Sequence, residues 1–382
     1  MKKSLFALAA VGAFAGAAQA QSSVTVYGVL DIGLAQTANT NTTTSSVATK
    51  TTMSNTGVGS GNLATSVIGF RGTEDLGGGL KAGFHLEYGL GDVGTGANGG
   101  TGASSTAADA AGNTAGSGFG FASRLSFVSL ESKMGTLRLG RQLQSVHGVI
   151  AAGMPMGTNN VVGQMYSGGS NANPNSSSIR VQDVYVNRAI TFVTPNFSGA
   201  TLEVQTASQN FGTNGTVSAS KTSQAGAALN YSAGKLTAGL GAYNQQATTS
   251  AGASTTTKVI GASTTYDFGA LKAFVAYQSN KQENGAGAEI VKTSATSVGI
   301  SAPIDKATTV FASTFKGNRS GATANSTSLG SNDLSGFQVG ATYNLSKRSA
   351  LYAIYGTQEI KSTTSTSRVE SAGGAVGLRH TF

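Results

Sequence analysis

Three arginines embedded in apolar, alternating stretches are the residues of this sequence whose chemistry is easiest to name. Arg71, Arg124 and Arg138 occur in the segments GFRG, SRLSF and TLRLG. A guanidinium stays charged at any physiological pH, so a row of such side chains on one surface favours anions over cations. Successive side chains of a β-strand point to opposite faces. The neighbours predicted on the face opposite the arginines are Phe70, Leu125, Phe127, Leu137 and Leu139.

Residues suited to catalysis or metal binding are few and scattered. The three histidines, His85, His147 and His380, fall in different predicted elements, and the chain has no cysteine. A zinc site would need carboxylates at ligand spacing, and the sequence offers none. The stretch GTGANG, from Gly94, matches a dinucleotide-binding pattern but lacks the strand and helix that such a site needs. We therefore expect no cofactor, no metal ion and no enzymatic activity.

One pair of residues leaves an alternative function open, that of a hydrolase whose active site is built on the wall of a β-barrel. His85 and Glu87 lie on the same face of one predicted strand, and a hydrolase needs a Ser/His/acid constellation. Polar residues are expected on that face in any case. A second alternative is an exported adhesive or structural β-protein, because long segments rich in Gly, Ser and Thr would suit it.

Residues 1–20 have the pattern of a cleaved secretory signal peptide, in which Lys2 and Lys3 precede an apolar run that ends in AQA at positions 18–20. The mature chain, 21–382, then carries 23 Lys and Arg (25 less Lys2 and Lys3) against 16 Asp and Glu, a formal charge of +7. Such a modest basic charge suits small anions or anionic lipid head groups, and no dense stripe of Lys and Arg points to nucleic acid. No stretch reaches the roughly 18 consecutive apolar residues of a membrane-spanning helix.

Alternation with a period of two residues dominates the rest of the chain. In LKAGFHLEYGL, residues 80–90, one face is apolar while Lys81, His85 and Glu87 lie on the other. The segment FQVGATYNL, residues 337–345, alternates in the same way. These predicted strands are about 10 residues long, which is the length that a tilted strand needs to cross a bilayer.

Short and long connections alternate between the predicted strands. The short turns lie at about residues 76–79, 133–135, 197–199, 233–234, 267–269, 304–306 and 346–348. With the first strand, VTVYGVLDIGLAQ, and the last, SAGGAVGLRHTF, they predict sixteen strands. An even, antiparallel meander of this kind is typical of a transmembrane β-barrel with long extracellular loops. Phe382 would then lie in the aromatic girdle at the membrane interface, or act as a signal for barrel assembly.

Four segments resemble the trimeric general porins of Gram-negative outer membranes, in particular the β-proteobacterial branch: SVTVYGVLDIGLAQ, GFRGTEDLGGGLKAGFHLEYGL, SRLSFVSLESKMGTLRLGRQ and VGLRHTF. The resemblance covers the whole chain and is most specific in the first third and at the C-terminus. It implies an all-β, 16-stranded antiparallel barrel in outer-membrane lipid, a homotrimer, and passive diffusion of small hydrophilic solutes and ions. It also implies that the barrel assembly machinery recognises Phe382, and that the third long loop, at about 144–187, folds inward and constricts the pore.

The charge of that loop departs from the family's usual pattern. Such porins place an acidic Pro-Glu stretch in it, opposite arginines on the wall. This chain has GMPMGTNNVVGQM instead, and Asp183 is the loop's one carboxylate. We therefore expect Arg71, Arg124 and Arg138 to give the pore a weak anion preference.

Other wall residues follow from the same alternation. Lys81 and Glu87 are expected to line the pore with the arginines, whereas Val67 stands at a position that is often basic in the family. Arg141, in the GRQ motif, shares its alternation with Leu139 and is expected to face outward. The resemblance implies that Arg141 contacts a neighbouring subunit.

Overall fold

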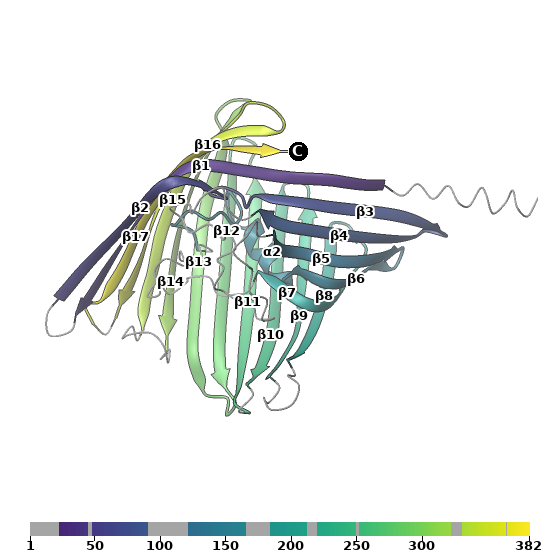
Figure 1. The fold of residues 1–382 in the computed structure, drawn as a ribbon, viewed down its shortest axis with the longest axis horizontal. Helices are drawn as coiled ribbons and strands as arrows, with labels where there is room; N and C mark the ends of the chain where they lie inside the picture. The colour runs from purple at the N-terminus through teal and green to yellow at the C-terminus, as the bar shows by residue number, and fades with distance from the viewer. Residues whose placement is uncertain are drawn as a thin grey trace, which may run out of the picture.

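The computed structural model describes residues 23–44, 48–90, 121–165, 184–211, 220–249, 252–321, 331–363 and 365–382 (Figure 1). Within these residues, seventeen strands form one antiparallel sheet. The predicted signal peptide, residues 1–20, and Asp183 lie outside the described residues. The strands are β1 (Ser23–Thr44), β2 (Ala48–Ser60), β3 (Val67–Gly77), β4 (Leu80–Leu90), β5 (Phe121–Ser132), β6 (Gly135–Leu143), β7 (Tyr185–Val193), β8 (Ala200–Phe211), β9 (Ser220–Ala233), β10 (Leu236–Thr248), β11 (Ser254–Asp267), β12 (Lys272–Asn284), β13 (Glu289–Pro303), β14 (Thr308–Ser320), β15 (Asn332–Asn344), β16 (Ser349–Ser362) and β17 (Arg368–Thr381).

The sheet closes on itself through β1. On one side β1 pairs with β17, from Val29 opposite Thr381 to Thr42 opposite Arg368, and Figure 1 shows the C-terminus beside β1. On its other side β1 pairs first with β3 and then with β2. Because β2 and β3 share one position in the wall, the barrel has sixteen strand positions, as the turns predicted.

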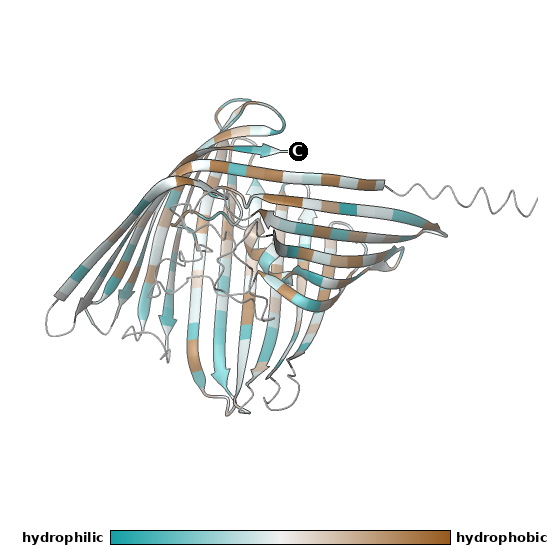
Figure 2. Cartoon of the chain, in the orientation of Figure 1, coloured by the Kyte–Doolittle hydropathy of each residue, from teal (hydrophilic) through white to brown (hydrophobic). Residues whose placement is uncertain are grey.

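The two faces of the wall differ in polarity. Leu240, Ile260, Val298 and Val376 point outward and are between 48% and 57% exposed. Figure 2 shows hydrophobic and hydrophilic positions alternating along the strands. An apolar surface around a closed barrel is what a lipid bilayer covers. No helix in the described residues is both long and apolar enough to cross a membrane.

The predicted short turns all join consecutive strands at one end of the barrel. The turn between β13 and β14 is organised by Asp305. Its Oδ1 accepts hydrogen bonds from the backbone N–H groups of Ala307 and Thr308, both at 2.7 Å, and its Oδ2 accepts one from Thr308 Oγ1 at 2.9 Å. These donors hold the pKa of the Asp305 carboxyl below its ordinary value.

A helix, α2 (Ser145–Ala152), lies inside the barrel (Figure 1). It packs on the inner surface of β8 to β12. Val146 and Ile150 are fully buried there. Gly261 on β11 leaves them room, because a Cβ at this position would lie within 3.0 Å of both side chains.

Candidate pore-lining site

The inserted segment, which we define as residues 144–165, follows the inside of the wall from β8 to β17. It begins beside Gln205 of β8, whose Nε2 donates to the carbonyl of Leu143 at 3.0 Å. It reaches β17 at Val162, which lies against Gly373. It then turns back, and the carbonyl of Met165 accepts a hydrogen bond from Gln278 Nε2 of β12 at 3.0 Å.

Uncharged side chains hold the inserted segment to the wall. Gln338 Nε2 donates to the carbonyls of Val161 and Val162 at 3.0 and 3.1 Å, and Gln338 Oε1 accepts from Asn159 Nδ2 at 2.8 Å. Ser263 Oγ donates to the carbonyl of Val149 at 2.6 Å. The segment itself contains no Asp, Glu, Lys or Arg. Its attachment therefore does not depend on ion pairs.

At its far end the backbone of the segment touches the backbone of the wall. A Cβ at Gly356 of β16 would overlap the carbonyl oxygen of Val162. A Cβ at Gly163 would overlap the carbonyl oxygen of Phe337, and Gly163 has a φ of +102°, in the region that glycine tolerates best. The two glycines allow a closer approach than any other residue would.

Four guanidinium groups gather on the part of the wall that the inserted segment leaves uncovered. Arg71 lies over the ring of Tyr27, with Cζ 5.3 Å from the ring centroid, and Arg138 lies over Phe127 at 5.8 Å. Arg124 and Arg141 both lie over the Tyr185 ring, at 5.5 and 4.7 Å. Guanidinium groups favour such positions over aromatic faces. We call this set, Arg71, Arg124, Arg138 and Arg141, the arginine cluster.

Glu87 is the carboxylate bonded to this cluster. Its Oε1 accepts from Arg124 Nε at 2.7 Å and its Oε2 from the Tyr27 hydroxyl at 2.8 Å. Within the described residues, no carboxylate lies within ion-pair distance of Arg71 or Arg138. Arg71, Arg124 and Arg138 outnumber the carboxylates beside them, Glu87 and Glu203, which leaves an excess of positive charge on this wall.

The prediction that Leu125 and Phe127 face outward is wrong. The pairing of β4 with β5 shifts between Glu87 and Tyr88, which leaves Arg124 as the additional residue of a β-bulge. Leu125 is therefore paired with Glu87, and the Phe127 ring lies under Arg138. A bulge interrupts the alternation, so Arg124 and Leu125 both turn inward although they are neighbours.

Arg141 belongs to the arginine cluster through the Tyr185 ring. It occupies an irregularity in the pairing of β6 with β7, so alternation with Leu139 does not fix its direction. Its Nε donates to the carbonyl of Ser123 at 3.0 Å and its Nη1 to Asn187 Oδ1. The contact with a neighbouring subunit stays a prediction.

Lys81 lies apart from these groups. It is close to the start of β4, opposite Asp75 and Glu131 near the short turns. Sequence reasoning missed Tyr27, near the start of β1, and Tyr185, the first residue of β7, whose rings lie under the guanidinium groups. Glu203 of β8 lies close enough to Arg138 to attract it electrostatically.

The terminal residue pairs with the first strand. Phe382 donates its N–H to the carbonyl of Gly28 at 3.1 Å and accepts from Gly28 N at 3.0 Å. Its ring covers Gly28, where a Cβ would overlap it. The ring is 43% exposed on the outer side, which is compatible with both predicted roles of Phe382.

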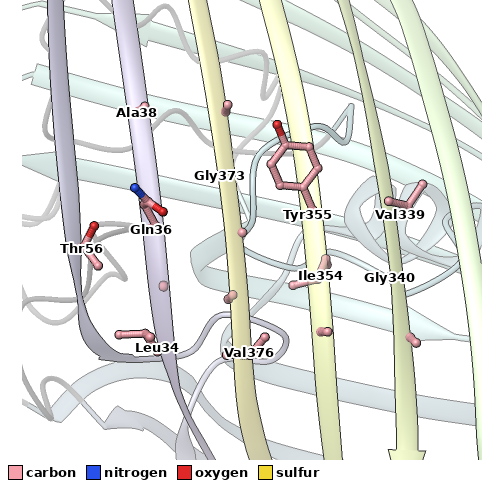
Figure 3. A pocket seen from close by; sticks show the side chains of 16 residues that line it. Leu34, Gln36, Ala38, Thr56, Val339, Gly340, Ile354, Tyr355, Gly373 and Val376 are labelled. Atoms are coloured by element: carbon pink, nitrogen blue, oxygen red, sulfur yellow. The ribbon is translucent and has the colours of Figure 1, made fainter.

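A separate depression of about 740 Å³ lies on the outside of the wall, over β15, β16, β17, β1 and β2 (Figure 3). The small residues Ala38 and Gly374 line it together with Leu34, Tyr355 and Val376, which point outward. The wall separates this depression from the inserted segment, so it is not part of a path through the barrel.

The chain matches the family model of the Gram-negative porins over residues 7–363. It is 34% identical to the outer membrane porin protein 32 of Delftia acidovorans over 314 residues, 80% of this chain and 76% of the relative. It is 29% identical over the whole length of both chains to an outer membrane porin protein of Bordetella pertussis. The structure of an anion-selective porin from Comamonas acidovorans superposes with a TM-score of 0.69 and 27% identity, covering 95% of this chain and 100% of that one. The OmpT barrel of Vibrio cholerae, 14% identical with a TM-score of 0.60 over 94% and 98% of the chains, shares the fold. The chain belongs to the Gram-negative porin family and forms a multi-pass outer-membrane channel for passive diffusion.

Proposed function

We propose that this porin passes small anions in preference to cations, through a narrow section between the inserted segment and the arginine cluster. The observation that carries the proposal is a charge imbalance. On one side of the path, Arg71, Arg124 and Arg138 have one bonded carboxylate among the described residues, that of Glu87, which pairs with Arg124. The inserted segment opposes them with no charged residue. The anion-selective porin from Comamonas acidovorans, similar in sequence and fold, supports the same direction.

The preference should be weak because water and salt screen the wall. The Debye length at physiological ionic strength is about 8 Å, comparable with the radius of a constricted pore. The positive potential therefore acts at the narrow section and fades in the wider parts. Glu87 and Glu203 reduce it further.

The test is the zero-current potential of purified protein in a planar bilayer across a KCl gradient. Wild-type channels should favour chloride, and Arg124→Ala should lower that preference. Arg368→Ala is the matched control, since it removes one arginine from the outward face, where Arg368 pairs with Glu359 and Glu370. A cation preference in the wild type, or equal potentials for wild type and Arg124→Ala, would refute the assignment.

We further propose that residues 1–20 are removed on export, that Phe382 is read by the barrel assembly machinery, and that the mature chain forms a homotrimer with Arg141 at a subunit contact. Family membership supports these points. A trimer should migrate anomalously in detergent gels until the sample is boiled. Identical migration with and without boiling, for protein that circular dichroism shows to be β-rich, would count against it.

A further inference from the structure

A carboxylate that the proposed selectivity does not use is completely buried in the wall. Asp31 of β1 has no exposed surface. Its Oδ2 accepts hydrogen bonds from the backbone N–H groups of Leu63 and Ala64, both at 2.6 Å. Its Oδ1 accepts one from the hydroxyl of Tyr352, also at 2.6 Å. Buried charges are rare unless they are satisfied in this way, so the position of Asp31 calls for a structural reason.

Asp31 stands where the wall is interrupted. The pairing of β1 with β3 ends at Val29, and that with β2 begins at Ile32. Between β2 and β3 the chain leaves the sheet over residues 61–66. There Asp31 N donates to Ser66 Oγ at 3.0 Å instead of to a neighbouring strand. The carboxylate of Asp31 thus binds backbone N–H groups of the departing segment.

Tyr352 reaches Asp31 from two strands away. It belongs to β16, whereas Asp31 is on β1, and β17 lies between them. The ring crosses β17 at Gly377, where a Cβ would overlap the hydroxyl oxygen. The same hydroxyl accepts from Asn62 Nδ2 at 3.3 Å. Asp31, Tyr352 and Asn62 therefore tie β1, β16 and segment 61–66 together.

Segment 61–66 in turn supports the far end of the inserted segment. Asn160 donates its backbone N–H to the carbonyl of Asn62 at 3.0 Å and its Nδ2 to the carbonyl of Gly61 at 2.5 Å. Leu63, whose N–H is bound by Asp31, packs in one buried cluster with Val161. Segment 61–66 thus holds Asn160 and Val161 from one side, while Gln338 holds Val161 and Val162 from the other.

We infer that Asp31 is a positioning residue, which fixes residues 159–162 of the inserted segment through segment 61–66 and so keeps the channel at one width. This inference rests on the proposed role of the inserted segment as one side of the narrow section. Asp31 itself is covered by protein and contacts no passing solute.

The test is single-channel recording of Asp31→Asn. Asparagine has one carbonyl oxygen in place of two carboxylate oxygens, so the backbone N–H groups or the Tyr352 hydroxyl must lose an acceptor. Segment 61–66 should then sample more than one position, and residues 159–162 with it. We expect a several-fold rise in open-channel current noise and closure at lower voltage. The ratio of anion to cation permeability should not fall, because the arginine cluster is untouched and the substitution removes a negative charge.

Asp305→Asn is the matched control. Asp305 also binds two backbone N–H groups and one hydroxyl, but in a short turn away from the inserted segment. Its variant should have the current noise and closing voltage of the wild type. Equal current noise in Asp31→Asn and Asp305→Asn would overturn the inference, provided that both proteins are assembled, as shown by a change in their gel migration on boiling.

Tyr352→Phe tests the positioning role of Asp31 if Asp31→Asn does not assemble. This variant keeps the ring and removes only the hydroxyl that bonds Asp31 and Asn62. It should show the same kind of change as Asp31→Asn, and wild-type noise and closing voltage in assembled Tyr352→Phe would overturn the inference. A wild-type channel without anion preference would defeat the proposed selectivity and leave these measurements valid.

Discussion

Neutralising Glu87 should make the channel more anion-preferring. Glu87→Gln removes the carboxylate bonded to the arginine cluster while keeping the shape of the side chain. The amide oxygen can still accept from Arg124 Nε or from the Tyr27 hydroxyl, which lie 2.7 and 2.8 Å from the present carboxylate oxygens. The main change is therefore one unit of charge on the wall.

The size of the effect follows from Coulomb's law. A unit charge about 7 Å from a passing ion contributes about 0.6 kcal/mol in water. Screening over a Debye length of about 8 Å reduces this to about 0.25 kcal/mol. Anions and cations feel opposite signs, so their difference changes by about 0.5 kcal/mol, which is roughly a twofold change in the permeability ratio.

Zero-current potentials across a KCl gradient measure this ratio. Glu87→Gln should shift the potential toward that of a more anion-selective channel, and Arg124→Ala should shift it the other way by a similar amount. At molar salt both shifts should nearly disappear, because the Debye length falls to about 3 Å. Shifts of the same sign in the two variants would refute the reasoning, since a charge effect must reverse with the charge removed.

Three further predictions test the wall itself. Gly356→Ala should push the carbonyl of Val162 off the wall, because the added methyl group would overlap it. Denaturant unfolding should show a free energy of unfolding lower by roughly 1–3 kcal/mol, and single-channel recording should show a changed conductance. If conductance and stability are both unchanged, the close backbone approach is unimportant. Phe382→Ser should reduce the amount of folded barrel in the outer membrane far more than Thr381→Ser does, as measured by immunoblot of membrane fractions. Equal amounts of the two variants would mean that the Phe382 ring is an interfacial contact only. Asp305→Asn should lower the thermal midpoint at pH 7, and by progressively less as the pH falls below about 4, because a carboxyl whose pKa is lowered by folding stabilises the protein fully above its ordinary pKa of about 4 and loses that effect as the pH falls through its lowered pKa. A difference that stays the same from pH 7 into acid would contradict this.

Regular alternation allowed most of the wall to be predicted from the sequence. The segment at 337–345 has Gln338 buried inside and Phe337, Val339 and Tyr343 exposed outside, as expected. The same rule failed at Leu125 and Phe127, because a β-bulge adds one residue to the strand, and a stretch as short as SRLSF gives no sign of it. At the bulge both Arg124 and Leu125 turn inward, which strict alternation does not allow for two neighbouring residues.

The interruption at residues 61–66 could not be predicted either. A count of turns gives the number of strand positions but does not show that one position is filled by two shorter strands. The partners of Asp31 are separated from it by up to 321 residues, and such contacts leave no local pattern. Asp31 in the sequence LDIGL reads only as one polar residue on an alternating strand.

The uncharged attachment of the inserted segment separates the width of the channel from its charge selectivity, two properties that salt would otherwise change together. Its bonds to Gln338, Gln278 and Ser263 join amide or hydroxyl groups to backbone carbonyls, so dissolved ions do not screen them as they screen exposed ion pairs. The arginine cluster, in contrast, acts on solutes through a screened potential. A bacterium that moves between fresh and saline water would therefore keep one size limit for solutes, while the charge discrimination of the same aperture rises on dilution and falls in salt.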